Sequence, residues 1–406
     1  MRPFILFTLL LACGLAQALP PLQLYVELTP PGGTLKPAPG TYSGPVVIRK
    51  PIILDGGGQV ILDGGGQGTV LTIEADGTVV RGLHITHSGS SHDGVDAGVL
   101  IKADGVTLED NRIDQSLFGV HLSGANDNLI RGNRITSLPE RDISLRGDAI
   151  RVWYSHGNRI ENNEIAHSRD LVFSNASENR IVGNHIHHGR ISMEFIYSPE
   201  NEVLDNHLEH NVTGITVIYS EFIDIRRNRI AHMRKLTGSG ITVKESYDIR
   251  IQENEIAHCA VGLLATSPLQ PENVLTIEGN LFTYNDVATY FYGEKGGHHI
   301  IDNRFIDNFV DVMGSAPATT RLNHWRGNYW DRYAGFDFDD DGFGDRPYSV
   351  WLYADRIWME RSMARFFRGS VALSLVDFME RLLPASTPDL IYQDPAPRMA
   401  APGGDF

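Results

Sequence analysis

The sequence predicts an all-β fold, a right-handed parallel β-helix of about ten coils of roughly 22 residues, with a C-terminal helical and extended tail. Three observations predict it: an asparagine motif that returns at a regular interval, a second short apolar strand in every repeat, and no helical periodicity before residue 350. The content of 42% hydrophobic residues is sufficient for a large core and excludes a disordered chain.

The first observation is an Asn-x-apolar motif that recurs along most of the chain. It begins at Asn111, Asn133, Asn163, Asn184, Asn206, Asn228, Asn254, Asn280 and Asn303. The steps between these asparagines range from 21 to 30 residues, and a period of this length is typical of a solenoid. Because stacked coils lie about 4.8 Å apart, we expect equivalent asparagines to form a ladder whose amides bond the turn backbone.

Each repeat also contains a second short segment in which apolar and polar residues alternate. Examples are Gly119-Val-His-Leu122, Ala149-Ile-Arg-Val152, Gly214-Ile-Thr-Val217 and Gly240-Ile-Thr-Val243. A period of two directs one row of side chains inward and the other outward. Nothing of helical period separates these segments, so helical repeat folds are excluded.

Residues 1–18 are predicted to be a cleavable signal peptide that exports the protein to the periplasm. Arg2 precedes an apolar stretch from Phe4 to Leu11, and Ala16-Gln-Ala18 fits a cleavage site. Cys13 follows Leu-Leu-Ala, which leaves a lipid anchor as the alternative. No later stretch approaches the length of an apolar membrane span, so we expect contact with a membrane only through partners.

The mature chain is expected to have three parts. The parallel β-helix is assigned to residues 19–330, an acidic Asp/Gly loop to residues 331–349, and a helical and Pro-rich segment to residues 350–406. Within the last part, helices are expected over residues 351–367 and 371–383. This segment either caps the open end of the solenoid or docks on a partner.

Charge and cysteine content limit the classes of partner and the source of stability. The chain has 35 Lys and Arg residues against 50 Asp and Glu residues, a formal net charge of −15. This balance argues against nucleic acid as the main partner, because no cationic surplus exists to neutralise phosphates. Cys13 and Cys259 are the only cysteines, so we expect the mature chain to be stabilised by packing rather than by internal disulfides.

A column of histidines emerges when equivalent positions of consecutive repeats are compared. The residues four places after the asparagine are His167, His188, His210, His232 and His258. Stacked coils would hold neighbouring imidazoles about 4.8 Å apart, a gap that one metal ion can bridge. The candidate copper ligands are His188, His210, His232 and His258, with Met233 and Cys259 as soft sulfur ligands. The alternative is an imidazole ladder that only lines a turn, with Cys259 as a buried apolar residue.

An acidic loop places carboxylates at alternate positions before a glycine turn. Its candidate calcium ligands are Asp337, Asp339, Asp341 and Asp345. The spacing resembles the first half of a calcium loop, and the expected role of the ion is structural. The twelfth position is Tyr348 instead of Glu, so the loop is not an EF-hand. A solvated turn held by Asx hydrogen bonds is the alternative.

The sequence gives little indication of catalysis. Acids and bases at outward positions, interpreted as a solvated face, are Asp148, Arg151, Glu194, Lys244 and Glu245. Cleavage of a polysaccharide needs two carboxylates that flank one bond, or a calcium-assisted base. Neither the paired aspartates with Gly-His-Gly of polygalacturonases nor the Asp-Pro-His-Asp of alginate epimerases is present. We therefore expect no enzymatic activity.

Several segments together resemble one family, the NosD-type maturation proteins of nitrous-oxide reductase. These segments are Leu54-Asp-Gly-Gly-Gly58, Gly82-Leu-His-Ile85, Gly147 to Ser155, Gly240 to Ser246, Asn323-His-Trp-Arg-Gly-Asn-Tyr-Trp330, Gly335 to Tyr348 and Asp377 to Pro395. Generic β-helices share the asparagine repeats but not this ordered C-terminal set. Family members often carry Met before Tyr-Ser, where this chain has Ile196 and Ile218. This difference shifts a copper site towards the histidine column, Met193 and Met233.

The resemblance implies a periplasmic accessory protein that docks on an ABC transporter made of permease and ATPase subunits. It would deliver copper, or support sulfur delivery, while the copper clusters of nitrous-oxide reductase assemble. A membrane copper chaperone is the implied donor, copper the transient cargo and calcium a possible structural ion. The alternatives are a secreted carbohydrate-active β-helix enzyme, a lyase or epimerase of a uronic-acid polysaccharide, and a surface adhesin.

Overall fold

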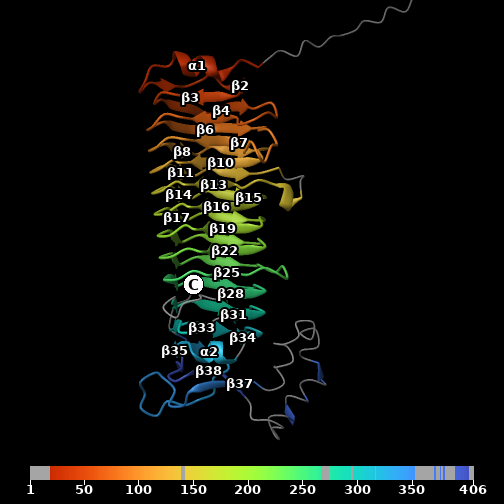
Figure 1. The fold of residues 1–406 in the computed structure, drawn as a ribbon, viewed down its shortest axis with the longest axis vertical. Coiled ribbons are helices and arrows are strands. Elements are labelled where there is room, and N and C mark those ends of the chain that lie inside the picture. The colour runs from red at the N-terminus through yellow and green to blue at the C-terminus, as the bar shows by residue number, and fades with distance from the viewer. Residues whose placement is uncertain are drawn as a thin grey trace, which may run out of the picture.

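The computed structural model describes residues 19–138, 142–266, 274–293, 296–315, 317–352, 370–371, 375, 378–379 and 389–401. The chain winds into one elongated stack of parallel strands, with helix α1 (Leu22–Leu28) at one end and strands β37 (Tyr348–Leu352) and β38 (Asp389–Asp394) at the other (Figure 1). Among these residues, no helix is long and apolar enough to cross a membrane. The predicted parallel β-helix architecture is confirmed.

Every coil contributes strands to two large sheets, and all neighbours within these sheets are parallel. The 12-stranded sheet consists of β3 (Val46–Ile48), β5 (Leu71–Ile73), β7 (Ala97–Ile101), β10 (Phe118–Ser123), β13 (Ile150–Trp153), β16 (Asp170–Ser174), β19 (Ile191–Ile196), β22 (Thr213–Ile218), β25 (Ile241–Lys244), β28 (Val261–Thr266), β31 (Val287–Tyr292) and β34 (Val310–Gly314).

The 24-stranded sheet takes two strands from most coils. Its strands are β1 (Thr34–Leu35), β2 (Gly40–Ser43), β4 (Ile53–Asp63), β6 (Val79–Thr86), β8 (Thr107–Glu109), β9 (Arg112–Asp114), β11 (Leu129–Arg131), β12 (Arg134–Thr136), β14 (Arg159–Glu161), β15 (Glu164–Ala166), β17 (Arg180–Val182), β18 (His185–His187), β20 (Glu202–Leu204), β21 (His207–Glu209), β23 (Asp224–Arg226), β24 (Arg229–Ala231), β26 (Ile249–Gln252), β27 (Glu255–Ala257), β29 (Leu275–Glu278), β30 (Leu281–Thr283), β32 (His299–Ile301), β33 (Arg304–Ile306), β35 (His324–Arg326) and β36 (Tyr329–Trp330). Strands β4 and β6 each run through both positions of their coil as one strand.

The solenoid has about twelve turns instead of the roughly ten expected, as the 12-stranded sheet shows. The additional turns lie before Asn111, where the asparagine motif that set the expected number is absent. Glycines form the corners there instead. Gly57, Gly58, Gly65 and Gly66 all have positive φ angles, between 56° and 76°, which glycine adopts without steric cost.

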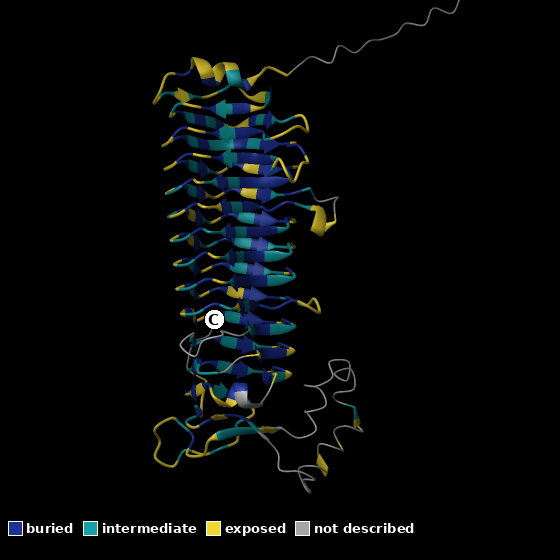
Figure 2. Ribbon diagram, viewed as in Figure 1, coloured by how far each residue is buried: buried dark blue, intermediate teal, exposed yellow. Residues whose placement is uncertain are grey.

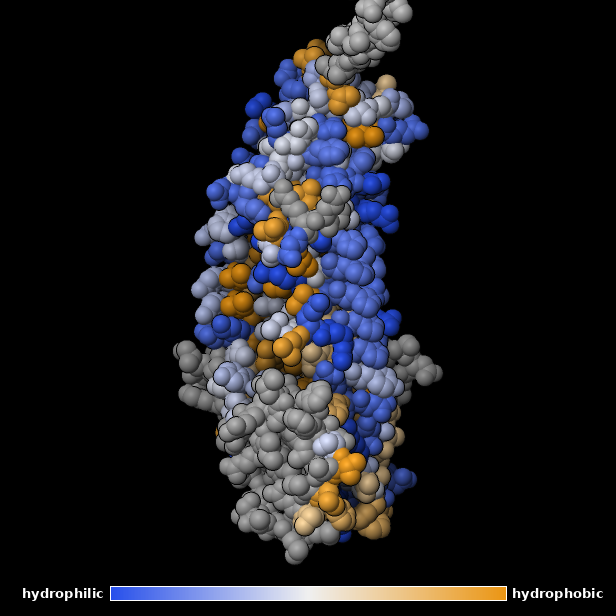
Figure 3. Space-filling model, turned by 90° about the vertical axis from the view of Figure 1, so that its right-hand side faces the viewer, coloured by the Kyte–Doolittle hydropathy of each residue, from blue (hydrophilic) through white to orange (hydrophobic). Residues whose placement is uncertain are grey.

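The core is a set of apolar rows that run along the stack. Ile165, Ile186, Leu208 and Ile230 are direct neighbours on consecutive strands, and each is at most 3% exposed. Burial alternates along the strands, while the turns are largely exposed (Figure 2). On the face shown in Figure 3, hydrophilic side chains form a continuous band along one border, and hydrophobic side chains are exposed beside it. The period-two pattern therefore separates core from surface as predicted.

The predicted asparagine ladder is present and extends to Asn328. The Asn184 backbone N–H and Nδ2 donate to Asn206 Oδ1 at 2.9 and 3.0 Å, and Asn184 Nδ2 also donates to the carbonyl of Ile160 at 2.8 Å. The same bonding continues coil after coil, and every member is at most 2% exposed. The ladder thereby satisfies backbone groups that burial would otherwise leave without partners.

The last rung of this ladder is not an asparagine. Asp394 on β38 accepts hydrogen bonds at Oδ2 from the backbone N–H of Asn328 at 3.0 Å, from Asn328 Nδ2 at 2.9 Å and from Trp330 Nε1 at 3.2 Å. Tyr392 on the same strand packs against Trp330, with ring centres 5.2 Å apart. Strand β38 and helix α2 (Pro317–Arg321) thus cover one open end, while α1 covers the other with Leu22 and Val26 buried.

The tail differs in part from expectation. Trp351 and Leu352, expected at the start of a helix, end strand β37, which pairs antiparallel with β38. Residues 348–352 are mostly aromatic or aliphatic, and such residues favour a pleated, half-buried strand. Val371, Leu375, Phe378 and Met379 are helical and exposed. The remainder of the helices expected over 351–367 and 371–383 lies outside the described residues, as does the expected signal peptide.

Replacement of Asp394 by alanine is expected to lower the free energy of unfolding by about 3 kcal/mol, because three buried donors lose their shared acceptor. Asp394→Asn should lose less, because an amide oxygen can accept the same bonds. Urea denaturation of both variants and the wild-type chain measures the difference. Equal stability of the alanine variant and the wild type would show that this carboxylate does not hold the end of the stack.

Candidate functional site

The histidine column lies in the turns between the two sheets. His167, His188, His210, His232 and His258 all have φ between 53° and 63°, the left-handed region that histidine enters more readily than most residues. The backbone N–H groups of His210, His232 and His258 donate to carbonyls of the next coil at 3.1 to 3.2 Å. The turn backbone therefore fixes each imidazole at the same place in its coil.

Four of these rings form a continuous stack, here called the histidine ladder: His188, His210, His232 and His258. The ring centres are 5.5, 4.6 and 4.9 Å apart, with interplanar angles of 26°, 4° and 1°. Tyr284 continues the stack at 5.1 Å, and His167 precedes it at 5.2 Å with a tilt of 37°. His188, His210 and His258 are exposed and His232 is half-buried, so the ladder is accessible from solvent.

The parallel rings limit what the ladder can bind. The lone pair of an imidazole lies in the ring plane, so stacked rings present single donors side by side and not two donors that converge on one ion. Burial lowers the pKa of His188 and His232, and the neighbouring imidazoles lower both further. Neutral imidazole is the metal-binding form. The ladder can therefore hold ions loosely at single nitrogens, and a shared ion requires a ring to rotate.

The structure does not bring the two predicted sulfur ligands to the ladder. Met233 and Cys259 follow His232 and His258 directly, but both are 0% exposed and belong to the hydrophobic core. The left-handed turn residue reverses the side of the backbone on which the next side chain lies. Burial raises the pKa of Cys259 to about 12, so its thiol stays protonated. Met193 is also buried in the core.

A second group of possible ligands lies beside the ladder, on the outward face of strands β15, β18 and β21. This histidine–glutamate cluster consists of Glu164, His185, His187, His207 and Glu209. The sequence did not predict it because only the fourth and fifth positions after each asparagine were considered as ligand positions. Its residues occupy the first and third positions after the asparagine, which are the outward positions of the strand that follows. A comparison of these two positions in consecutive repeats would have predicted the cluster. Glu164 pairs with His185 in register, as does His185 with His207 and His187 with Glu209.

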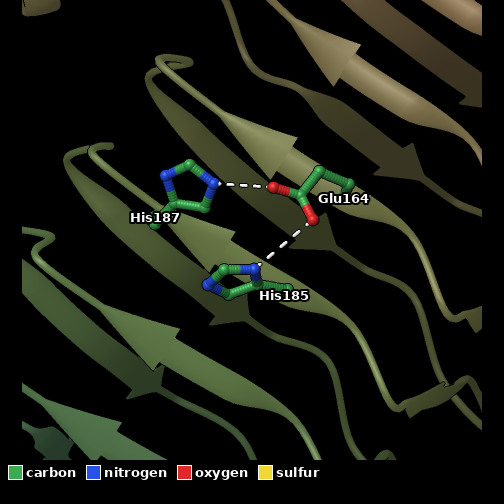
Figure 4. A group of neighbouring side chains, drawn as sticks. All are labelled: Glu164, His185 and His187. Carbon is green, nitrogen blue, oxygen red and sulfur yellow. Dashed lines mark hydrogen bonds and ion pairs between the residues drawn. The ribbon is translucent and has the colours of Figure 1, made fainter.

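Glu164 lies between two imidazoles. Its Oε1 is 2.8 Å from His187 Nε2 and its Oε2 is 3.4 Å from His185 Nδ1 (Figure 4). The other nitrogen of His185, Nε2, is 3.0 Å from Glu209 Oε1. Desolvation raises the pKa of both carboxyl groups, but hydrogen bonds from the imidazoles and their charge outweigh it, so both pKa values lie below the usual range. The two glutamates are therefore ionised at neutral pH.

The acidic loop brings three of its four predicted calcium ligands together. Carboxylate oxygens of Asp337, Asp339 and Asp341 lie within 4.8 Å of one another. The charge of Asp341 raises the pKa of Asp339, a repulsion that a cation would relieve. Asp337 accepts hydrogen bonds from the backbone of Asp341 and Gly342. Asp345 does not join this group and accepts from the backbone N–H of Phe338 at 2.6 Å.

The 12-stranded sheet carries a buried charge network where a solvated face was expected. Asp148 is 2% exposed and accepts from Arg169 Nε and Nη2 at 3.1 and 2.8 Å. Asp170, also buried, accepts from Arg190 Nε at 2.9 Å. Burial raises the pKa of Glu194, and the charge of Asp170 raises it further. The expectation of a solvated side chain was wrong for Asp148, because the guanidinium of Arg169 compensates its burial.

His121, on β10 of the same sheet, provides a test by pH. Burial, aided by the charges of Arg151 and Lys102, lowers the pKa of His121 from 6.5 to about 4, and its Nε2 is buried without a hydrogen-bond partner. Below pH 6.5, His121 binds a proton in the unfolded chain but stays unprotonated in the folded chain. The free energy of unfolding therefore decreases as the pH falls towards 4.

The free energy of unfolding should fall between pH 7 and pH 4 in both the wild-type chain and His121→Gln. We expect the fall to be smaller in His121→Gln by on the order of 2 kcal/mol, because glutamine does not bind a proton. Urea denaturation at a series of pH values measures both curves. Parallel curves would show that His121 takes up its proton equally in the folded and unfolded states.

If the acidic loop binds calcium as its sequence predicts, saturating Ca²⁺ should raise the melting temperature by about 3 °C, and chelation should reverse the rise. Asp339→Asn with Asp341→Asn should abolish the response. Asp110→Asn with Asp127→Asn is the matched control, since both aspartates are exposed turn residues elsewhere in the solenoid. A melting temperature that chelation leaves unchanged would contradict the calcium site.

Part of the chain matches a known family, and two known proteins are similar to most of it. Residues 136–335 match the family described as "Periplasmic copper-binding protein (NosD)". A protein of Stutzerimonas stutzeri named "Probable ABC transporter binding protein NosD" is 29% identical over 420 residues, covering 97% of this chain and 93% of that protein. A protein of the same name from Pseudomonas aeruginosa is 28% identical over 399 residues, covering 90% and 88%.

Among solved structures, the A-module of mannuronan C-5 epimerase AlgE6 from Azotobacter vinelandii is similar, with a TM-score of 0.52 and 13% sequence identity. The similarity covers 74% of this chain and 92% of that module. At this identity the likeness shows a shared β-helix fold and nothing about activity. Residues 136–335 thus match the NosD family, and the chain is similar to NosD proteins over nearly its whole length.

Proposed function

We propose that this protein is a periplasmic accessory protein of an ABC transporter that holds copper for the assembly of the copper clusters of nitrous-oxide reductase. The family description, copper-binding and periplasmic, and the name of the two relatives, ABC transporter binding protein, support the proposal. Its partners would be the permease and ATPase subunits, the reductase and a membrane copper chaperone.

The observation that carries the proposal is the histidine ladder. Four accessible imidazoles on consecutive coils are stacked with ring centres about 5 Å apart, and imidazole is a good ligand for copper. Single nitrogens that do not converge bind weakly and release readily. Such a row suits a protein that receives an ion from one partner and passes it to another.

The state of Cys259 favours copper over sulfur as the cargo. A protein that carries sulfur covalently needs an accessible thiolate, because the thiolate is the reactive form. Cys259 is 0% exposed, and burial raises its pKa to about 12. It is the only cysteine in the described part of the chain.

The alternative of a polysaccharide lyase or epimerase has less support. The fold that the chain shares with the epimerase module does not by itself imply shared catalytic residues. On the 12-stranded sheet, Asp148 and Asp170 are bound by the guanidinium groups of Arg169 and Arg190. A carboxylate held in this way is not free to act as a general acid or base.

A titration with cuprous ion tests the ladder. Replacement of His210 and His232 by alanine leaves His188 and His258 with no adjacent ladder imidazole that could rotate to share an ion, and it is expected to weaken cuprous binding at least about tenfold. The affinity is measured by competition with a chromophoric cuprous chelator under reducing, oxygen-free conditions.

His299→Ala with His324→Ala is the matched control. These two imidazoles are also stacked, with centres 5.0 Å apart, but they lie on strands β32 and β35, away from the ladder. Unchanged cuprous affinity in the ladder variant, or equal losses in both variants, would contradict a role of the ladder in copper binding.

A further inference from the structure

We propose that Glu164, His185 and His187 form a binding site for one divalent cation of the borderline class, such as Zn²⁺, Ni²⁺ or Cu²⁺. None of its three ligands belongs to the histidine ladder, although His188 of the ladder contacts His187, and the site does not depend on the proposed role in copper delivery. The case rests on the positions of the three donor groups, on the groups that orient them, and on their access to solvent.

The donor atoms converge as a metal site requires. Glu164 Oε1 lies 2.8 Å from His187 Nε2, and Glu164 Oε2 lies 3.4 Å from His185 Nδ1. Two ligands of one tetrahedral ion, each bound at about 2.0–2.1 Å, are about 3.3 Å apart. The imidazole rings of His185 and His187 are inclined by 38° to each other, with centres 4.6 Å apart, and both face the same carboxylate (Figure 4). In the ladder, by contrast, the rings are nearly parallel.

Both imidazoles are oriented through the nitrogen that faces away from Glu164. His185 Nε2 is 3.0 Å from Glu209 Oε1, and His187 Nδ1 is 2.8 Å from His188 Nδ1. Metal-binding histidines usually donate their second ring N–H to a carboxylate or another acceptor, which fixes the tautomer and directs the free lone pair towards the ion. Glu209 and His188 are therefore positioning residues of this site.

His185 also limits the site to one ion. A second group, His185, His207 and Glu209, has ligand atoms within 4.8 Å of one another. Both groups need His185, and a neutral imidazole has only one nitrogen lone pair for a metal. Glu164 lies 2.8 and 3.4 Å from its two imidazoles, while Glu209 lies 3.0 Å from His185 Nε2 and 3.6 Å from His207 Nε2. The shorter contacts favour the Glu164 group.

The site is open to solvent, and its neighbours leave room for an ion. The side chains of Glu164, His185 and His187 are 39%, 34% and 17% exposed. Ala166, the neighbour of His187 on β15, has no bulk to cover the site. Three protein ligands leave a fourth position for water, an arrangement typical of exchangeable ions. A carboxylate oxygen with two imidazoles favours a borderline divalent ion over monovalent copper, which prefers softer ligands.

The test is equilibrium dialysis of the full chain with Zn²⁺ as the probe. We expect one Zn²⁺ per wild-type chain and a dissociation constant raised at least about tenfold by Glu164→Gln, which keeps the hydrogen-bonding shape but removes the charged ligand. Glu255→Gln is the matched control: Glu255 is a partly buried outward residue of the same sheet, paired with Arg229. It should bind Zn²⁺ like the wild type.

Two further variants separate the site from its neighbours. Glu209→Gln can still accept the His185 N–H and should change the dissociation constant less than about threefold, whereas a loss equal to that of Glu164→Gln would place the ion in the other group and overturn the assignment. His210→Ala with His232→Ala should leave Zn²⁺ binding unchanged, because neither residue is a ligand. Absence of Zn²⁺ binding by the wild-type chain, or unchanged binding by Glu164→Gln, would also overturn it.

Discussion

The registration of one coil over the next is the constraint on which the rest of this structure depends. The asparagine ladder holds this registration. The oxygen of each side-chain amide accepts two hydrogen bonds from the coil before it, and the amide nitrogen donates to the next asparagine and to backbone carbonyl groups. Backbone hydrogen bonds alone would tolerate a slip between coils. A buried polar column does not, because a displaced asparagine leaves several donors and acceptors without partners in a dry interior.

The same registration determines which surface side chains lie next to one another. Residues about 22 positions apart become neighbours at the spacing of adjacent strands, so a single substitution in one repeat acts within a vertical row. The turn position yields parallel imidazoles, whereas the outward strand positions yield imidazoles that face carboxylates. Two arrangements of potential metal ligands therefore follow from the same stacking: a row of single donors and a convergent group. Their ligand chemistry differs, which permits two ions of different character on one face.

The fold and the stacking of the histidines could be predicted from the sequence, because the same pattern occurs in many repeats and each repeat supports the same inference. The asparagine interval and the alternation of apolar residues determined the fold, and the position of the histidines determined that their rings would stack. The side on which Met233 and Cys259 lie could not be deduced from spacing, since it depends on the left-handed conformation of the preceding histidine. The Glu164 group required comparison of two outward positions at once. The burial of Asp148 depends on Arg169, which lies on the next coil.

The identity of the last rung has a consequence for the assembly of the molecule. Each asparagine both accepts from the coil before it and donates to the coil after it, so a stack of asparagines could grow without limit. Asp394 accepts from Asn328 at Oδ2, but its side chain has no amide N–H groups to donate to a further coil. The repeat thus ends on a residue whose side chain closes the ladder and does not extend it to another coil.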